Sequence, residues 1–174
     1  MASVLTGVLT RVVGGASRQR YFSIFLRDHM VAAVAGLELA RRTRGENKEG
    51  ELGAFLATLV TKLESERGTL RDLARRVEIE PSSIGEAGGW LAEKAARIKL
   101  NGQLFGYSPL SRVAELEALM VFAQQRLAFW RILERHSRVE KRLEGIPFSA
   151  HLESADEDRR LLERYLMEAA DKTF

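Results

Sequence analysis

The 174-residue sequence contains no cysteine and only three prolines. The lack of cysteine excludes disulfide bonds, thiolate nucleophiles, cysteine-based zinc sites and iron–sulfur clusters. The scarcity of proline leaves long stretches in which nothing interrupts a helix. No run of 18 apolar residues occurs, so we expect no transmembrane segment. Alanine, leucine, glutamate and arginine are abundant instead, and these strong helix formers predict an all-α protein.

Acidic residues are missing from the first 27 residues, which contain Arg11, Arg18, Arg20 and Arg27. The rest of the chain is close to neutral, because basic and acidic side chains nearly balance there. No basic stripe stands out, and we therefore expect no nucleic-acid binding.

Residues 1–20 form a short amphipathic segment of apolar and basic residues, and the pair Gly14-Gly15 predicts a break after it. The segment fits a short docked helix, and it also fits a targeting peptide. Arg20-Tyr21-Phe22-Ser23 resembles a mitochondrial processing site. We expect a cytoplasmic protein, with the mitochondrial matrix as the alternative if residues 1–22 are a targeting peptide.

Apolar residues recur at helical spacing in five later stretches, which predict helices at about 21–44, 51–77, 83–100, 109–143 and from Ser154 onward. Ser108-Pro109 has the pattern of an N-cap followed by proline at the first helical position. Ser83 to Glu86 and Ser154 to Glu157 match the capping box and predict two further helix starts.

Short connections force neighbouring helices to run antiparallel. Residues 21–174 are therefore expected to form one domain, an up-down-up-down antiparallel four-helix bundle with an extra C-terminal helix. No segment alternates at a period of two, so we expect no β-sheet.

Polar residues that interrupt an apolar helix face are the usual places for metal or cofactor sites in a bundle. The candidates here are His29, Glu66, Glu117 and Glu134. Glu66 lies within a seam of leucines, where a carboxylate is costly unless it is paired or binds a ligand. For Glu66 we favour an ion pair at the edge of the bundle, for example with an arginine of another helix, over a metal ligand. For His29 we favour hydrogen-bonded packing.

The stretch from Glu64 to Leu73 resembles the second helix of ferritin-like proteins, in which a Glu-x-x-His pair helps to hold two irons. Glu66 matches the glutamate, but Thr69 stands in place of the histidine, and the fourth expected helix has Ser137 three residues after Glu134. The resemblance implies a ferritin-like bundle that lacks the complete di-iron motif.

Three functions remain open. The first is a non-catalytic module that acts in structure or protein–protein interaction, binds a protein partner or itself as a homo-oligomer, and needs no cofactor. The second is a ferritin-like redox protein that binds iron or another divalent metal through Glu66, His29, Glu117 and Glu134, with Glu38 as a further ligand. The third is a bundle that binds a small molecule or lipid in a cavity lined by Met30, Met120 and aromatic residues. We favour the first.

Overall fold

The computed structural model describes the backbone of residues 2–79 and 107–174, and side chains from residue 17 onward within those ranges. In chain order it contains α1 (Ala2–Glu46), α2 (Gly50–Arg76), α4 (Pro109–His136), the short 3₁₀ helix η1 (Lys141–Leu143) and α5 (Phe148–Asp171). All ordered elements in the described ranges are helices, which confirms the expected all-α class.

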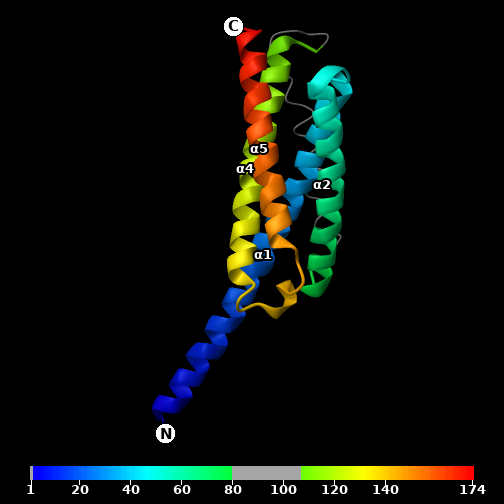
Figure 1. Cartoon of the computed structure of the whole chain (residues 1–174). Helices are drawn as coiled ribbons and strands as arrows, with labels where there is room; N and C mark the ends of the chain where they lie inside the picture. The colour runs from blue at the N-terminus through cyan, green and yellow to red at the C-terminus, as the bar shows by residue number, and fades with distance from the viewer. Residues whose placement is uncertain (1, 80–106) are drawn as a thin grey trace.

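The four long helices pack side by side, and the N-terminal end of α1 extends beyond the other three (Figure 1). α1 and α5 run in one direction, whereas α2 and α4 run in the other. Contacts at both ends agree with these directions. The Nε atom of Arg112, near the start of α4, donates to Asn47 Oδ1 before α2 at 2.6 Å. The Nη1 atom of Arg76, at the end of α2, donates to the carbonyl of Glu144 after α4 at 2.8 Å.

Two predicted helix starts can be compared directly with the structure. α2 begins at Gly50, one residue before the predicted start. The Ser108-Pro109 start is confirmed, because Ser108 Oγ accepts a hydrogen bond from the backbone N–H of Ser111 at 3.0 Å. The helix expected at 83–100 lies outside the described residues. The alternation of the first four helices and the status of α5 as an extra helix therefore remain predictions.

Three predicted boundaries are wrong. α1 continues through Gly14-Gly15, since glycine lowers the stability of a helix interior by only about 1 kcal/mol relative to alanine. α4 ends at His136, and the chain then turns so that Leu143 is buried in the core. α5 begins at Phe148, six residues before Ser154, because Pro147 occupies its N-cap and Phe148 packs near Trp130 with ring centroids 6.3 Å apart.

The core consists of two apolar clusters at different levels of the bundle. The first, here the Tyr165 cluster, includes Leu37, Ala40, Leu56, Leu59, Val60, Leu116, Leu119, Ala123, Leu162, Tyr165, Leu166 and Ala169. The second, here the Trp130 cluster, includes Leu26, Met30, Leu70, Leu73, Ala74, Val77, Phe129, Trp130, Leu133 and Leu143. Every described long helix contributes to the core, and α5 contributes four residues to the first cluster. α5 is thus an integral part of the packed bundle.

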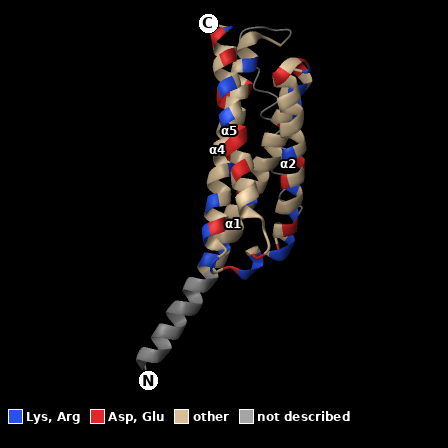
Figure 2. Ribbon diagram, in the orientation of Figure 1, with Lys and Arg blue, Asp and Glu red and all other residues tan. Residues whose placement is uncertain are grey.

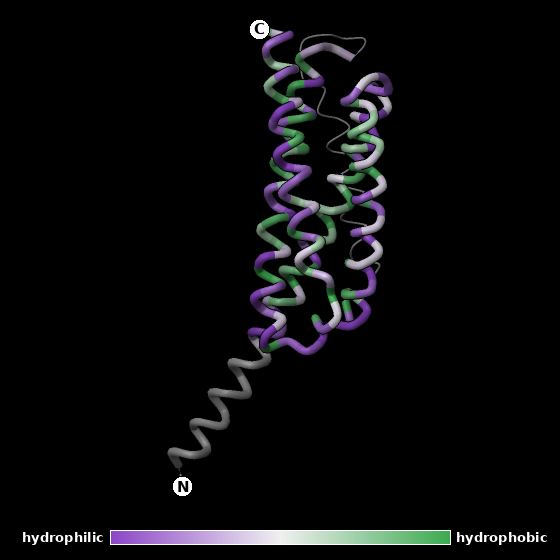
Figure 3. The backbone as a smooth tube through the Cα atoms, in the orientation of Figure 1, coloured by the Kyte–Doolittle hydropathy of each residue, from purple (hydrophilic) through white to green (hydrophobic). Residues whose placement is uncertain are grey.

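Acidic and basic residues are interspersed along the described helices (Figure 2), and hydrophobic and hydrophilic residues alternate along each of them (Figure 3). This alternation is typical of amphipathic helices that bury one side. None of the described helices has an apolar stretch that would span a bilayer.

Candidate functional site

A group of charged side chains lies between the two apolar clusters. We call it the Arg126 cluster, and it consists of Lys62 and Glu66 from α2, Arg126 from α4, and Glu157 and Asp158 from α5. Glu66 and Asp158 are both buried, and the side chain of Asp158 has no exposed surface. Charges at this depth are uncommon in proteins unless they are paired.

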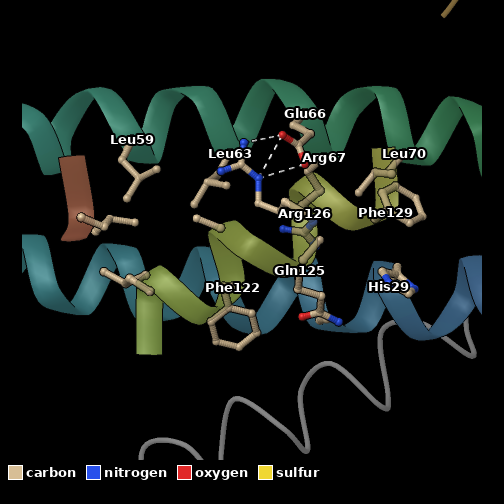
Figure 4. Close-up of a pocket in the computed structure, with 16 residues that line it drawn as sticks. His29, Leu59, Leu63, Glu66, Arg67, Leu70, Phe122, Gln125, Arg126 and Phe129 are labelled. Atoms are coloured by element: carbon tan, nitrogen blue, oxygen red, sulfur yellow. Dashed lines mark hydrogen bonds and ion pairs between the residues drawn. The ribbon is translucent and has the colours of Figure 1, made fainter. Parts of the chain in front are cut away.

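Arg126 is the centre of this group. Its Nη2 atom donates to Glu66 Oε2 at 2.6 Å, and its Nε atom lies 3.2 Å from both carboxylate oxygens of Glu66 (Figure 4). Its Nη1 atom donates to Asp158 Oδ2 at 3.0 Å. A guanidinium presents several N–H donors in a planar fork, which allows one side chain to bind two carboxylates. Arg126 therefore joins α4 to both α2 and α5.

Lys62 binds the second oxygen of Asp158 and links the group to the surface. Its Nζ atom donates to Asp158 Oδ1 at 3.0 Å and to Glu157 Oε2 at 2.8 Å. Lys62 and Glu66 are four residues apart on α2, so their side chains lie on the same face of that helix. As a result, both oxygens of the fully buried Asp158 carboxylate have a cationic partner.

The surroundings keep both cations charged. Burial by itself lowers the pKa of the Arg126 guanidinium, but attraction and hydrogen bonds from Glu66 and Asp158 outweigh it, and the pKa is raised. Burial likewise lowers the pKa of Lys62, whereas its hydrogen bonds to Glu157 and Asp158 raise the pKa above the usual value. The Arg126 cluster is therefore a set of fixed ion pairs, and neither cation is a proton donor or acceptor near neutral pH.

A small cavity borders the cluster on the side of α1. Its volume is about 40 Å³, and its walls include His29, Leu63, Glu66, Phe122 and Arg126 (Figure 4). One water needs at least about 10–15 Å³ measured in this way, whereas sites for drug-sized ligands occupy about 300–1,000 Å³. The cavity has room for a few waters or one small ion.

The structure brings together two of the four residues suggested as metal ligands. His29 and Glu66 line the same cavity. Glu117 and Glu134 are exposed on α4 and do not line it. The Nδ1 atom of His29 lies 2.9 Å from the carbonyl oxygen of Phe25, and its ring stacks on Phe129 with centroids 4.7 Å apart. The expectation of hydrogen-bonded packing for His29 is confirmed.

The available donors do not fit a pair of metal ions. The Glu66 oxygens are bound by Arg126, and the Asp158 oxygens are bound by Arg126 and Lys62. Glu38 forms an ion pair with Arg41 at 2.6 Å. Across the described residues, no three His, Asp or Glu side chains are placed so that they could hold a metal together. The expected ion pair between Glu66 and an arginine of another helix is confirmed, but its expected position at the edge of the bundle is wrong, because both side chains are buried.

The two methionines suggested for a lipid cavity belong to different parts of the core. Met30 belongs to the Trp130 cluster, whereas Met120 packs against the Tyr165 cluster. Phe122 and Phe129 line the small cavity described above without either methionine. The cavity beside the Arg126 cluster is therefore not the one suggested for a lipid.

Sequence reasoning missed Arg126, and it placed Asp158 on a solvated face of the last helix, which is wrong because the Asp158 side chain is fully buried. One signal was present. Arg126 directly precedes Leu127 and lies three residues after Ala123 and four before Trp130, all of which are buried, so the helical repeat places it on the core side of α4. Asp158 is four residues before Leu162 on the same face of α5.

A second polar network closes the end of the bundle where α2 and α4 begin. Asn47 Nδ2 donates to the carbonyl of Thr43 at 2.8 Å and to Tyr107 Oη at 2.9 Å, and Tyr107 Oη donates to Glu115 Oε2 at 3.0 Å. Arg42 forms an ion pair with Glu115 at 2.9 Å. Burial, which outweighs the hydrogen bond from Asn47, raises the pKa of Tyr107 to about 12. This network holds the α1–α2 connection against α4.

No family model matches the chain, and no curated protein or solved structure is significantly similar to it.

Proposed function

We propose that this chain is a non-catalytic helical-bundle module that acts through protein–protein contacts and associates with itself. The observation that carries the proposal is the position of Arg126. Its guanidinium binds carboxylates from two neighbouring helices in the middle of the bundle. In metal-binding bundles this level is where carboxylates from facing helices hold the metal ions. Here a protein side chain supplies the positive charge permanently.

The chemistry of the cluster favours a structural role. Arginine is effectively always protonated and cannot act as a general base. Both carboxylates bound to Arg126 are buried, and each of their oxygens already has a cationic partner, which disfavours a metal ion as a further ligand. The cluster joins α2 to α4 and α5 across the bundle, which fixes how these helices lie against each other.

We further propose that the bundle is ferritin-like, with the extra C-terminal helix that the sequence predicts. The support is the stretch from Glu64 to Leu73 of α2, in which Glu66 matches the glutamate of the di-iron motif while Thr69 stands in place of the histidine.

Metal loading tests the proposal. The full chain is incubated with Fe²⁺ under anaerobic conditions, passed through a desalting column and analysed for iron, and oxygen consumption is then followed. We expect well below one equivalent of iron per chain and no oxidation above the rate of free Fe²⁺. Stoichiometric iron with catalysed oxidation would overturn the proposal in favour of the ferritin-like redox protein.

A matched variant sharpens this result. Arg126→Ala removes the guanidinium and leaves Glu66 and Asp158 in place. If iron binds to this variant and not to the original chain, the guanidinium is what keeps the metal out, as proposed. If the original chain already binds iron as well as the variant, the ion pairs do not exclude the metal and the proposal fails.

A further inference from the structure

The end of the bundle where α1 extends beyond the other helices and α4 ends is richer in positive charge than the opposite end (Figure 2). We call it the basic end, and it consists of residues 17–28, 71–79 and 131–144. It contains eleven basic and six acidic side chains. The opposite end, residues 41–52, 107–117 and 163–174, contains seven basic and eight acidic side chains. The bundle is therefore polarised along its length.

Two contacts join the chain segments of the basic end. The Nη2 atom of Arg142, in η1, donates to Gln19 Oε1 of α1 at 2.6 Å. The ring of Phe22 lies against the ring of His136 at the end of α4, with centroids 4.7 Å apart. The segment that follows α4 therefore lies beside α1 at the level where α1 extends out of the bundle (Figure 1).

Several cations of the basic end have no acidic partner. Three of the six acidic side chains there already pair with an arginine of the same end. Five exposed basic side chains form no ion pair within the described residues, and we call them the unpaired cations. They are Arg18, Arg20, Arg135, Arg138 and Lys141. Cations gathered in this way attract a partner that carries negative charge.

Exposed apolar side chains lie among these cations. Tyr21 follows Arg20 and is 68% exposed, and Val139 follows Arg138 and is 79% exposed. One exposed apolar residue alone needs no explanation. Here, however, both are next to unpaired cations at the same end of the bundle. Tyrosine and basic residues together are typical of surfaces that meet the interface of a bilayer.

Residues 2–16, here the N-terminal extension, add an amphipathic helix to the basic end. They belong to α1, extend beyond the other helices (Figure 1), and span about 22 Å at the usual helical rise. The helical repeat places Thr6, Thr10 and Arg11 on one side of this helix and the large apolar residues on the other. These apolar residues are Val4, Leu5, Val8, Leu9, Val12 and Val13.

We propose that the basic end and the N-terminal extension together dock on the surface of a bilayer that contains anionic lipids. The extension lies along the interface with its apolar side toward the acyl chains, and the unpaired cations face the lipid headgroups. An amphipathic helix and a basic patch are two signals whose combination gives stable attachment without a membrane-spanning helix. The inference goes beyond the proposed function, because the partner that it names is a lipid surface.

The charge and the apolar residues together favour a bilayer over two other partners. A second copy of the chain brings the same positive end, and the two ends repel each other. A nucleic acid attracts the unpaired cations through its phosphates. It offers no apolar phase to the N-terminal extension, to Tyr21 or to Val139. An anionic bilayer matches both features at once.

Vesicle flotation with the full chain tests the proposal. We expect the chain to float with vesicles of equimolar phosphatidylcholine and phosphatidylserine and to stay behind with vesicles of phosphatidylcholine alone. Added salt should weaken the binding, because it screens the attraction between the cations and the headgroups. A chain that does not bind the anionic vesicles at low salt overturns the proposal. A chain that binds duplex DNA but not these vesicles overturns it in favour of a nucleic acid.

Two triple variants with the same loss of charge test which end docks. Arg135→Gln, Arg138→Gln and Lys141→Gln together should weaken vesicle binding by ~100-fold, since each basic residue near an anionic surface contributes about fivefold. The control combines Arg44→Gln, Lys48→Gln and Lys172→Gln at the opposite end. These three residues are exposed and form no ion pair within the described residues, and their loss should leave binding nearly unchanged. Equal losses in the two triple variants overturn the proposal.

Two single variants test whether the N-terminal extension enters the interface. Leu5→Gln places a polar side chain on the apolar side of the extension and should weaken vesicle binding by about tenfold. Thr10→Gln is the matched control on the polar side and should have little effect, because that side faces water. Equal binding of the two variants means that the extension does not enter the interface, and this result also overturns the proposal.

Discussion

The two faces of α4 invert the usual arrangement of a surface helix. The inner face holds Arg126, whose side chain is only 11% exposed, and the outer face holds Val121 and Ile132 in contact with solvent. A helix of this length normally turns its charges outward and its aliphatic residues inward. Residue polarity alone therefore does not predict which face of α4 is buried and which is exposed.

Each face meets a different requirement. The inner charges are stable because three carboxylates and two cations are arranged as pairs with hydrogen bonds at 2.6–3.2 Å. Replacing a whole buried ion pair with apolar residues is often neutral, whereas removing one member is strongly unfavourable. The outer aliphatic residues are separated by polar and small residues along α4, and single aliphatic side chains at a protein surface are common.

Arg126→Ala is expected to have the largest effect on stability. It leaves the buried Glu66 carboxylate without a cationic partner and leaves Asp158 with Lys62 alone. The free energy of unfolding should fall by about 3–5 kcal/mol, measured by urea denaturation. Arg164→Ala is the control, since Arg164 pairs with Glu168 at 3.8 Å on the surface and should matter by no more than about 0.5 kcal/mol. Equal losses in the two variants would contradict a special role for the inner face.

The triple variant Glu66→Leu, Arg126→Met and Asp158→Leu separates stability from specificity. If the cluster mainly positions the helices, the triple variant should recover most of the stability lost in Arg126→Ala. A triple variant that is less stable than Arg126→Ala would mean that the ion pairs themselves supply the stability.

Lys62 pairs with one buried and one exposed carboxylate, so the two ion pairs can be compared at the same lysine. It binds both Asp158, which is fully buried, and Glu157, whose side chain is 58% exposed. Asp158→Asn should lower the free energy of unfolding by about 2–3 kcal/mol, because the amide loses the negative charge, keeps only one acceptor oxygen and turns an N–H₂ donor toward the second buried cation. Glu157→Gln should change it by no more than about 0.5 kcal/mol. The prediction fails if the two substitutions, measured in the same urea titration, have the same cost.

The helices that could be predicted from sequence are those whose apolar residues recur regularly. In α2 the leucines at 56, 59, 70 and 73 are all buried, as the helical period predicts, whereas Leu52 and Leu63 are partly exposed. The start of α4 was also predictable, because a serine N-cap before proline is a local signal. The start of α5 was not, because the packing of Phe148 on Trp130 is a contact between distant residues.

Only part of the candidate site could be predicted from the sequence, because only Glu66 has a strong local signal. Glu66 interrupts a leucine seam, and that local irregularity identified it. Its partner Arg126 is 60 residues away along the chain, and Asp158 is 32 residues beyond Arg126. The helical repeat places both on the inner faces of their helices, but arginine and aspartate are normally exposed, so this position alone does not predict that they are buried. Only the packing of three helices at one level reveals the pairing.

Two glycines of α2 extend the comparison between inner and outer positions. A Cβ atom added at Gly53 would lie 2.5 Å from the backbone carbonyl atoms of Lys48, whereas one at Gly68 would meet nothing within 4 Å. Gly53→Ala should therefore destabilise the fold by about 1–3 kcal/mol through overpacking. Gly68→Ala should stabilise it by up to about 1 kcal/mol, because alanine favours the helix. Thermal unfolding of both variants checks the opposite signs, and a stabilised Gly53→Ala would contradict the close approach.

The smallest expected effect concerns His151, which stacks on Trp130 at the inner face of α4 with ring centroids 4.1 Å apart. Its Nε2 atom has no hydrogen-bond partner in the described part of the chain. Burial, together with repulsion from Arg126 and against attraction from Glu66, lowers the pKa of His151 below 6.5.

Because the pKa of His151 is lower in the folded state, the unfolded chain binds more protons in mild acid, and stability must fall as the pH falls through 6.5 toward that lower pKa. His151→Phe keeps a ring against Trp130 but cannot be protonated, so its stability should fall less between about pH 7 and pH 5. His29 and His136 are present in both proteins, so the difference between the two urea titration series isolates His151. Identical pH dependence in the two series would show that the inner face of α4 tolerates a charged imidazole beside Arg126, and would weaken the distinction between its two faces.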